Sequence, residues 1–245
     1  MSLAISIALI LILIFWGIFR VKIKGAIGEN TTSSILYFLD KSKYKVINNI
    51  VLEVAGKTTQ IDHIVVSDFG VFVIETKNYK GWILGGENSE YWTQVLFKRK
   101  EKFYNPIRQN LGHIRALKSC LNEYHNLKYI SIIVFSSKAD IKVNTNTEVV
   151  YSHQLIKTIE RYTDVNLMET EKEAISQRIT ASNLKDIYDK RSHIRSIKQR
   201  VQSREDSIKE NKCPQCGGDL VKRNSKFGYF LGCNSYPRCK FTLNI

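Results

Sequence analysis

Runs of β-branched residues dominate the chain between residues 44 and 77, and they are interrupted at Gly56 and at Asp68–Gly70. Such runs, bounded by turn residues, are typical of strands. We therefore predict strands over 44–54, 60–67 and 70–77. Two further strands are expected over 82–85 and 91–97, and the apolar run over 129–135 indicates a buried strand.

Apolar residues at helical spacing predict the helices that accompany these strands. Segment 25–40 opens with glycines and capping residues and then becomes apolar, which indicates a first helix. Asn105–Pro106 is a cap followed by proline at the first helical position, and one apolar stripe follows it: Ile107, Leu111, Ile114, Leu117 and Leu121. Another helix is expected over 152–162. This order of elements predicts an α/β or α+β core.

Residues 166–212 read as polar and helical. Ile187, Ile194, Val201 and Ile208 recur every seven residues, which supplies half of a coiled-coil seam. Nine basic and five acidic side chains lie between residues 184 and 212. The segment therefore predicts either a solvated connecting helix or an arm that follows phosphates.

The N-terminus carries no charged side chain before Arg20, and residues 3–19 read LAISIALILILIFWGIF. This run predicts a transmembrane anchor over residues 1–21. Arg20, Lys22 and Lys24 follow it, so the positive-inside rule predicts a single-pass protein of the inner (cytoplasmic) membrane, with its N-terminus outside and its domains in the cytoplasm. A cleaved signal peptide and a buried core helix are the alternatives.

Net charge narrows the classes of binding partner, and the position of the cysteines narrows the kind of fold. The 245 residues carry a net charge of +14, which favours DNA, RNA or anionic lipid over acidic proteins or neutral metabolites. Four of the five cysteines lie in the last 33 residues, which excludes a disulfide framework along the whole chain.

Two carboxylates are expected to meet on neighbouring strands. If Asp68–Phe69 turns the chain, Asp62 lies opposite Glu75, and alternation places Lys77 on the same face. The same alternation assigns Ile61 to the face of Val65. Opposed buried carboxylates repel unless a cation lies between them, so Asp62 and Glu75 predict a site for Mg²⁺ or Mn²⁺ that polarises a phosphoryl oxygen. The alternative is an ordinary cross-strand ion pair.

The cysteine spacing predicts a structural zinc site. Cys213 and Cys216 form a C-x2-C pair, and Cys233 and Cys239 follow after a hairpin-length insert. Four thiolates suit tetrahedral zinc, and a tail of this size needs the metal to fold. A reduced or disulfide-bonded tail is the alternative. Cations and aromatic rings surround the cysteines and predict contacts with DNA, with single strands as one candidate form: Lys222, Arg223, Lys226, Phe227, Tyr229, Phe230, Tyr236, Arg238 and Lys240. A zinc-stapled cap for protein contacts is the other reading.

Several ordered motifs resemble one family. Gly28–Glu29, QIDH at 60–63, GVFVIETKNYKG at 70–81, Trp92, Asn105–Pro106, Gln109–Asn110 and His113 together are similar to the nuclease-related (NERD) domain, over about residues 24–135. The resemblance implies a restriction-endonuclease-like core of the PD-(D/E)xK type. It implies that Asp62 and Glu75 bind metal, that Lys77 is the catalytic lysine, and that Glu29 and Gln109 add polar groups. Ile61 stands where the PD element has proline. The C-terminal segment resembles the four-cysteine zinc finger of bacterial type I topoisomerases, which implies DNA binding.

These observations predict an anchored α/β protein that hydrolyses DNA with a divalent metal. The expected divisions are an anchor at 1–21, a nuclease-like domain at 22–165, a basic helical connector at 166–212 and a zinc ribbon at 213–245. No small-molecule cofactor is expected, and the oligomeric state is left open. A non-catalytic module that binds DNA and tethers it to the membrane is the main alternative, and RNA hydrolysis is a third.

Overall fold

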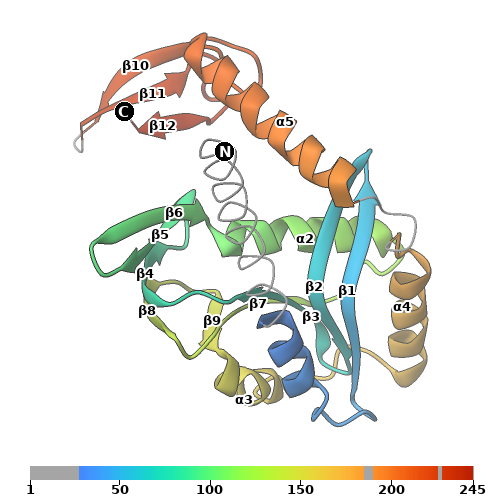
Figure 1. Ribbon diagram of the computed structural model, residues 1–245. Helices are drawn as coiled ribbons and strands as arrows, with labels where there is room; N and C mark the ends of the chain where they lie inside the picture. Colours follow the sequence, from blue (N-terminus) through green and yellow to red (C-terminus); the bar gives the residue numbers. More distant parts are fainter. Residues whose placement is uncertain (1–27, 185–189, 226–227, 245) are drawn as a thin grey trace, which may run out of the picture. The chain divides into compact units, whose positions relative to one another are not determined.

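Two compact units with separate cores make up the chain, Met1–Ile187 and Tyr188–Ile245. The computed structural model describes residues 28–184, 190–225 and 228–244 (Figure 1). Within the described residues the protein is a mixed α/β structure, as predicted, with a four-cysteine site in its C-terminal unit.

A five-stranded sheet organises the first unit, in the order β1-β2-β3-β7-β9. Strands β1, β2 and β3 are antiparallel neighbours, whereas β7 and β9 run parallel to β3. Their bounds are Tyr44–Val54, Lys57–Ser67, Gly70–Lys77, Tyr129–Phe135 and Glu148–Tyr151 for β1, β2, β3, β7 and β9. The apolar runs therefore located four of these strands. The signal is clearest for β3 and β7, which are mostly buried, because strands buried on both faces are rich in β-branched residues.

Helices cover both faces of this sheet. Helices α2 (Pro106–Cys120) and α4 (Glu169–Ala181) bury Leu117 and Ile175 against one face. A helix over residues 28–36 and α3 (Leu155–Glu160), which follows the 3-10 turn η1 (Ser152–Gln154), bury Leu36 and Leu155 against the other. Figure 1 shows α2 on one side of the sheet and the helix over 28–36, with α3, on the other. Leu111 departs from the predicted stripe, since it is 43% exposed.

A second sheet of four strands lies beside the first, in the order β6-β5-β4-β8. Its strands β4, β5, β6 and β8 span Gly81–Gly86, Tyr91–Leu96, Arg99–Tyr104 and Ala139–Asn144. Trp92 is fully buried here, and a Cβ atom at Gly85 would lie 2.3 Å from its ring. Strands β6, β8 and β9 differ from the prediction, which has no strand there. β6 is mostly charged and β9 is only four residues long, so neither stands out as an apolar run.

Asn49 changes which residues of the β1–β2 hairpin face the core. Its φ angle is +57°, and its position lies opposite Asp62 in the hairpin register. Beyond this point Ile61 packs in the same cluster as Ile64, not with Val65. The prediction that Ile61 shares a face with Val65 is therefore wrong. The left-handed Asn49 on β1 interrupts the hairpin next to Ile61, so the strict alternation on which the prediction was based does not hold there.

The second unit combines a helix with a small sheet. Helix α5 spans Lys190–Lys209, and strands β10, β11 and β12 span Leu220–Ser225, Gly228–Cys233 and Thr242–Asn244. Ile208 packs beside the cysteines, whereas Val201 is 52% exposed. Ile187 and the side chain of Ile194 lie outside the described part of the chain, so the coiled-coil seam gains no support from the positions that are described.

The prediction of a single-pass membrane protein is corrected by the structure. Among the described residues, no helix has the length and apolar character needed to cross a bilayer. The longest of these helices is α5, and its 20 residues include many charges, which a hydrocarbon core disfavours. The predicted anchor at 1–21 lies outside the described residues.

Candidate functional site

Glu75 and Lys77 form a buried ion pair at the end of β3. Lys77 Nζ donates to Glu75 Oε1 at 2.6 Å and to Gln109 Oε1 at 3.0 Å. Only 3% of the Glu75 side chain and 17% of the Lys77 side chain are exposed. Alternation along β3 brings the two side chains to one face, as predicted, and the main sheet provides the burial.

Helix α2 supplies the second half of the site. The Asn110 amide donates to the Val73 carbonyl at 2.7 Å and to Ser131 Oγ at 2.8 Å, which holds the helix on β3 and β7. Gln109 lies next to that anchor, and His113 is one turn further along the same helix. Anchoring by Asn110 thus sets the approach of both side chains to β3.

His113 links the Glu75 carboxylate to Thr59, a residue of β2. Its Nε2 lies 3.1 Å from Glu75 Oε2, and its Nδ1 lies 2.7 Å from Thr59 Oγ1. Because an ionised carboxylate only accepts, Nε2 is the donor, and the Thr59 hydroxyl donates to Nδ1 when the ring is neutral. The sequence assigns neither His113 nor Thr59 a role in the site. His113 belongs to the motifs that resemble the nuclease-related domain and lies four residues after Gln109, whereas Thr59 carries no such signal.

Asp62 lies where β2 and β3 separate. The ladder between the two strands ends at the pair His63 and Ile74, in the predicted register. One residue further on, Asp62 Oδ2 accepts a hydrogen bond from the Thr76 backbone N–H at 2.9 Å. The carboxylate therefore fills the opening between the strands beside Glu75. Asp62 itself is half-buried.

The pKa values of the two carboxylates, Asp62 and Glu75, shift in opposite directions. Burial, with the nearby charge of Glu75, raises the pKa of Asp62 well above its usual value, although the Thr76 N–H opposes this. Burial also acts to raise the pKa of Glu75, but Lys77 and His113 more than offset it and leave that pKa lowered. Burial acts to lower the pKa of Lys77, and Glu75 more than compensates, so the pKa is raised. Lys77 thus compensates Glu75 more fully than it compensates Asp62.

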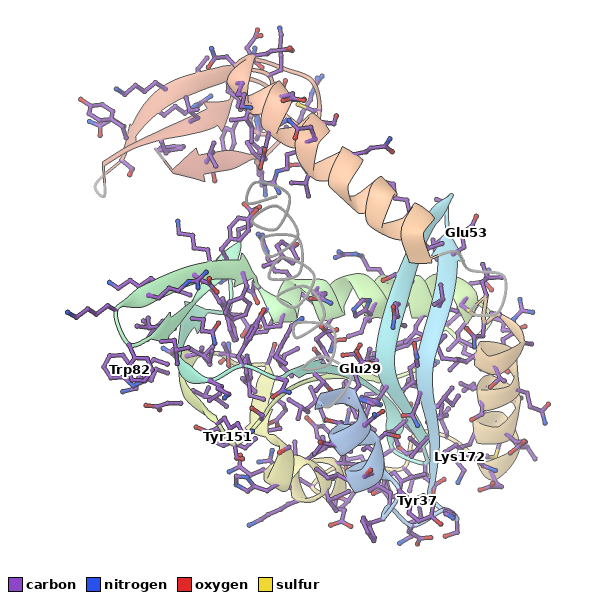
Figure 2. The ribbon with its side chains drawn as sticks, viewed as in Figure 1. Glu29, Tyr37, Glu53, Trp82, Tyr151 and Lys172 are labelled. Atoms are coloured by element: carbon purple, nitrogen blue, oxygen red, sulfur yellow. The ribbon has the colours of Figure 1, made fainter. Side chains whose placement is uncertain are left out.

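Glu29 belongs to the same electrostatic environment. It lies in the first turn of the helix over residues 28–36, and its charge contributes to the raised pKa of Asp62 (Figure 2). The predicted residues Asp62, Glu75, Lys77 and Gln109 are thus brought together, with Glu29 close enough to act on Asp62. Gln60 instead donates to Asn49 Oδ1 at 2.9 Å.

The four predicted cysteines form a zinc-binding site. Their Sγ atoms all lie within 4.8 Å of one another, and Cys213, Cys233 and Cys239 are buried. Within the described residues, no other group of three or more acidic, histidine or cysteine ligands is gathered this closely. Cys120 is not a member of this group, and its Sγ donates to Ser182 Oγ at 3.3 Å. The spacing along the sequence therefore identified the ligands correctly.

Cations and rings alternate on the zinc unit. Lys222 Nζ lies 4.3 Å from the centroid of the Tyr229 ring, and Arg223 lies 6.0 Å from that of Tyr236. Both tyrosines are exposed, as are Arg238 and Lys240. Phe230 is half-buried and lines a cavity of about 200 Å³ together with Arg223 and Tyr236. Lys226 and Phe227 lie outside the described residues.

The fold and its sites define a mixed α/β protein with a buried carboxylate–lysine cluster and a separate four-cysteine zinc unit. Family models match the nuclease-related domain over residues 24–136 and the topoisomerase DNA-binding C4 zinc finger over 210–245. The chain is 40% identical over 181 residues to an uncharacterized protein of Bacillus anthracis, covering 72% of this chain and 84% of that protein. The chain thus belongs to the nuclease-related-domain family and carries a topoisomerase-type zinc ribbon.

Relatives of the ribbon alone are DNA topoisomerases. DNA topoisomerase 1 of Helicobacter pylori is 62% identical over 29 residues, which are 12% of this chain and 4% of that enzyme. DNA topoisomerase 1 of Methanocaldococcus jannaschii is 64% identical over 46 residues, or 19% and 6% of the respective chains. The similarity is thus confined to a small part of each enzyme. No solved structure matches the chain.

Proposed function

We propose that this protein hydrolyses DNA phosphodiester bonds with a divalent metal, while its zinc ribbon holds the DNA. The family and the ribbon indicate a nuclease-like, DNA-binding protein. The observation that carries the catalytic step is the Asp62 carboxylate, held at the end of the β2–β3 ladder and only partly compensated by Lys77, beside the Glu75–Lys77 pair. In this proposal residues 22–165 carry the chemistry, 213–245 bind DNA, and 166–212 lie between them.

The residues present fit Mg²⁺ or Mn²⁺. Mg²⁺ is commonly bound through one or two carboxylates while it keeps several waters, so Asp62 and Glu75 suffice as protein ligands, with Glu29 nearby. A bound divalent ion would supply Lewis-acid polarisation of the phosphoryl oxygen and a water of lowered pKa. It would also offset the burial and the repulsion from Glu75 that together raise the pKa of Asp62.

Lys77 acts in this proposal as a fixed cation. Its raised pKa keeps the ammonium protonated at neutral pH, so it donates to a phosphoryl oxygen or orients the attacking water, and it does not accept a proton. Gln109 holds the ammonium from α2, and His113 holds Glu75 Oε2 from the same helix. A restriction-endonuclease-like core would place these groups in the same way.

The ribbon is proposed to bind single-stranded DNA. Tyr229 and Tyr236 are 60% and 63% exposed, and each lies beside a cation. Exposed rings flanked by cations hold unpaired bases by stacking and phosphates by charge, without reading the sequence.

One observation favours a second function. Both oxygens of Glu75 already accept hydrogen bonds, from Lys77 and from His113, so the cluster satisfies this carboxylate without a metal. A non-catalytic DNA-binding protein with a structural ion pair would show the same bonds. In that case neutralising Asp62 alters no activity.

A cleavage assay separates the two functions. We expect circular and linear DNA to be cut with Mg²⁺ or Mn²⁺, and Asp62→Asn, Glu75→Gln and Lys77→Ala each to lower the rate by at least about 100-fold. Glu53→Gln, an exposed carboxylate on β1, is the matched control and should cut normally. The catalytic proposal fails if the wild-type chain binds DNA but leaves it uncut with both metals.

A further inference from the structure

The outward face of the second sheet presents aromatic rings in ordered rows. Cross-strand pairing aligns Asp140, Trp82, Val95 and Lys100 in one row, and Lys142, Leu84, Thr93 and Lys102 in the next. Tyr91 and Tyr104 pair in a third row. Rows separated by two residues lie ~6.8 Å apart along a strand. We call these ten residues the aromatic face.

This face is exposed where an ordinary solvated sheet would be polar. Trp82, Tyr91 and Tyr104 are 51%, 50% and 45% exposed, and Leu84 is 37% exposed. The opposite face already supplies the core, since Ile83 and Trp92 are fully buried. Sheets that pack on one side usually alternate apolar residues inward with polar residues outward. The three outward rings are therefore not needed for packing and indicate a binding surface.

Lysines flank the rings at both edges of the sheet. Lys100 and Lys102 lie on β6, and in the part of the chain that the structure describes neither forms an ion pair with a carboxylate. Lys142 lies on β8, 4.4 Å from the centroid of the Trp82 ring and 3.5 Å from Asp140. The face thus carries three lysines and one aspartate, and its charge suits a polyanion.

The face is also continuous in sequence with the candidate catalytic cluster. Strand β4 begins four residues after Lys77, and Tyr104 ends β6 immediately before the Asn105 cap of α2, which carries Gln109. A polyanion bound on this sheet is therefore held by elements rooted at that cluster.

We propose that the aromatic face binds single-stranded DNA by stacking bases on Trp82, Tyr91 and Tyr104 while the flanking lysines contact phosphates. Rings on a sheet reach the flat faces of bases only where those bases are unpaired, which favours single strands over duplex. The inference rests on the proposed function for the choice of DNA, and it adds a binding surface distinct from the zinc ribbon.

Photo-crosslinking locates the contact in the full chain. An oligothymidylate containing 5-iodouracil is irradiated with the protein in buffer without added Mg²⁺ or Mn²⁺, so that the DNA stays intact and zinc stays bound. Peptides carrying cross-links are identified by mass spectrometry. We expect cross-links at Trp82, Tyr91 or Tyr104 in addition to any on the ribbon. Cross-links on the ribbon alone would overturn the proposal.

Variants test stacking and charge separately. Trp82→Ala and Tyr104→Ala should lower cross-linking at this face by roughly 5- to 150-fold, and Trp82→Phe should restore most of it because a ring remains. The double variant Lys100→Glu and Lys102→Glu alters exposed side chains only, so it tests the face even if an aromatic variant misfolds. Tyr37→Ala is the matched control: Tyr37 is 66% exposed with Lys41 over its ring, and Figure 2 shows it in a different part of the unit from Trp82.

Competition distinguishes the ligands and the two proposals. Unlabelled single-stranded DNA should displace the cross-link, whereas displacement as strong by duplex DNA, or stronger by oligouridylate RNA, would overturn the assignment. Because the cross-link needs no cleavage, a chain that never cuts DNA but cross-links at Trp82 refutes the nuclease and retains the aromatic face. A chain that cuts DNA but forms no cross-links at Trp82, Tyr91 or Tyr104 refutes the aromatic face and retains the nuclease.

Discussion

At the scale of single residues, Lys77 is the cation that makes the buried Glu75 tolerable. Nζ lies 2.6 Å from Glu75 Oε1, and both side chains are mostly excluded from water. A buried carboxylate without its partner is costly, whereas a buried pair replaced as a whole by neutral side chains often costs little. The energetic role of Lys77 is therefore separable from its proposed chemical role.

We predict that Lys77→Met lowers the free energy of unfolding by about 3–5 kcal/mol, because Glu75 loses its ammonium partner and keeps only the hydrogen bond from His113. The double variant Lys77→Met with Glu75→Gln should recover most of that loss, since the Glu75 charge is removed together with its partner. Urea unfolding of the wild type, of Lys77→Met and Glu75→Gln singly, and of the double variant completes the double-mutant cycle. Equal losses in the Lys77→Met single and the double variant would contradict this account.

His63 gives a prediction for acid. It is 2% exposed, its Nδ1 lies 2.7 Å from Asn48 Oδ1, and its Nε2 has no partner within the described residues. Burial lowers its pKa from 6.5 to about 4. The unfolded chain therefore binds a proton that the folded chain does not, and stability falls as pH drops from 6.5 toward 4.

The size of the acid effect is up to about 3 kcal/mol for this one group. His63→Gln should remove that part of the pH dependence, although it lowers stability at neutral pH through poorer packing. Urea unfolding at several pH values without divalent cations measures both effects. His153→Gln alters a histidine classed as exposed and serves as the control. A His63→Gln chain as acid-sensitive as the wild type would show that another group titrates.

At the scale of elements, the approach of α2 to β3 is set from its N-terminus as well as by Asn110. The fully buried Asn105 amide donates to the carbonyls of Gly86, Glu87 and Ser89, at 3.3, 3.0 and 2.7 Å. Its Oδ1 caps the helix by accepting from the Ile107 N–H at 2.9 Å. Asn105 therefore ties the helix that carries Gln109 and His113 to the β4–β5 turn.

We predict that Asn105→Ala costs about 2–4 kcal/mol of stability, from the lost cap and the unsatisfied carbonyls. Asn105→Asp keeps the capping acceptor but loses the amide donors, so it should recover only part of the loss. Thermal and urea unfolding of both variants distinguish the two contributions. Full recovery by aspartate would mean that the cap alone matters.

At the scale of the whole molecule, the two units owe their stability to different sources. Among the described residues, the first unit has three apolar clusters around its sheets, whereas the second has one small cluster that includes three of the cysteines. A core of that size does not stabilise a fold by itself, and zinc binding supplies the missing free energy.

Removing zinc should therefore unfold one unit and spare the other. After treatment with a zinc chelator, or in Cys233→Ser, we expect proteolysis within residues 213–244 while the core from 44 to 181 stays resistant. Mass spectrometry of the fragments reports both regions. Cys120→Ser should behave as the wild type, since its thiol contacts Ser182 and not the cluster. A ribbon that remains protease-resistant without metal would contradict this prediction.

Local pattern alone determined a large part of this protein. Apolar runs and turn residues located β1, β2, β3 and β7. They also predicted the register that brings Asp62 toward Glu75, because the contacts that define a hairpin are close in sequence. The spacing of the four cysteines identified the zinc ligands for the same reason, since two short clusters across a hairpin suffice for a tetrahedral site. The ordered motifs between Gly28 and His113 also identified the nuclease-related-domain family.

Tertiary structure decided what depends on contacts between distant segments. The bond from His113 to Glu75 joins α2 to β3, and only the packing of the helix on the sheet brings them together. The left-handed Asn49 places Ile61 on a different face from the predicted one. The charged segment Arg99–Tyr104 forms β6 because it pairs with β5. The aromatic face likewise exists only because four strands align their outward side chains, an arrangement that the periodicity of one strand does not encode.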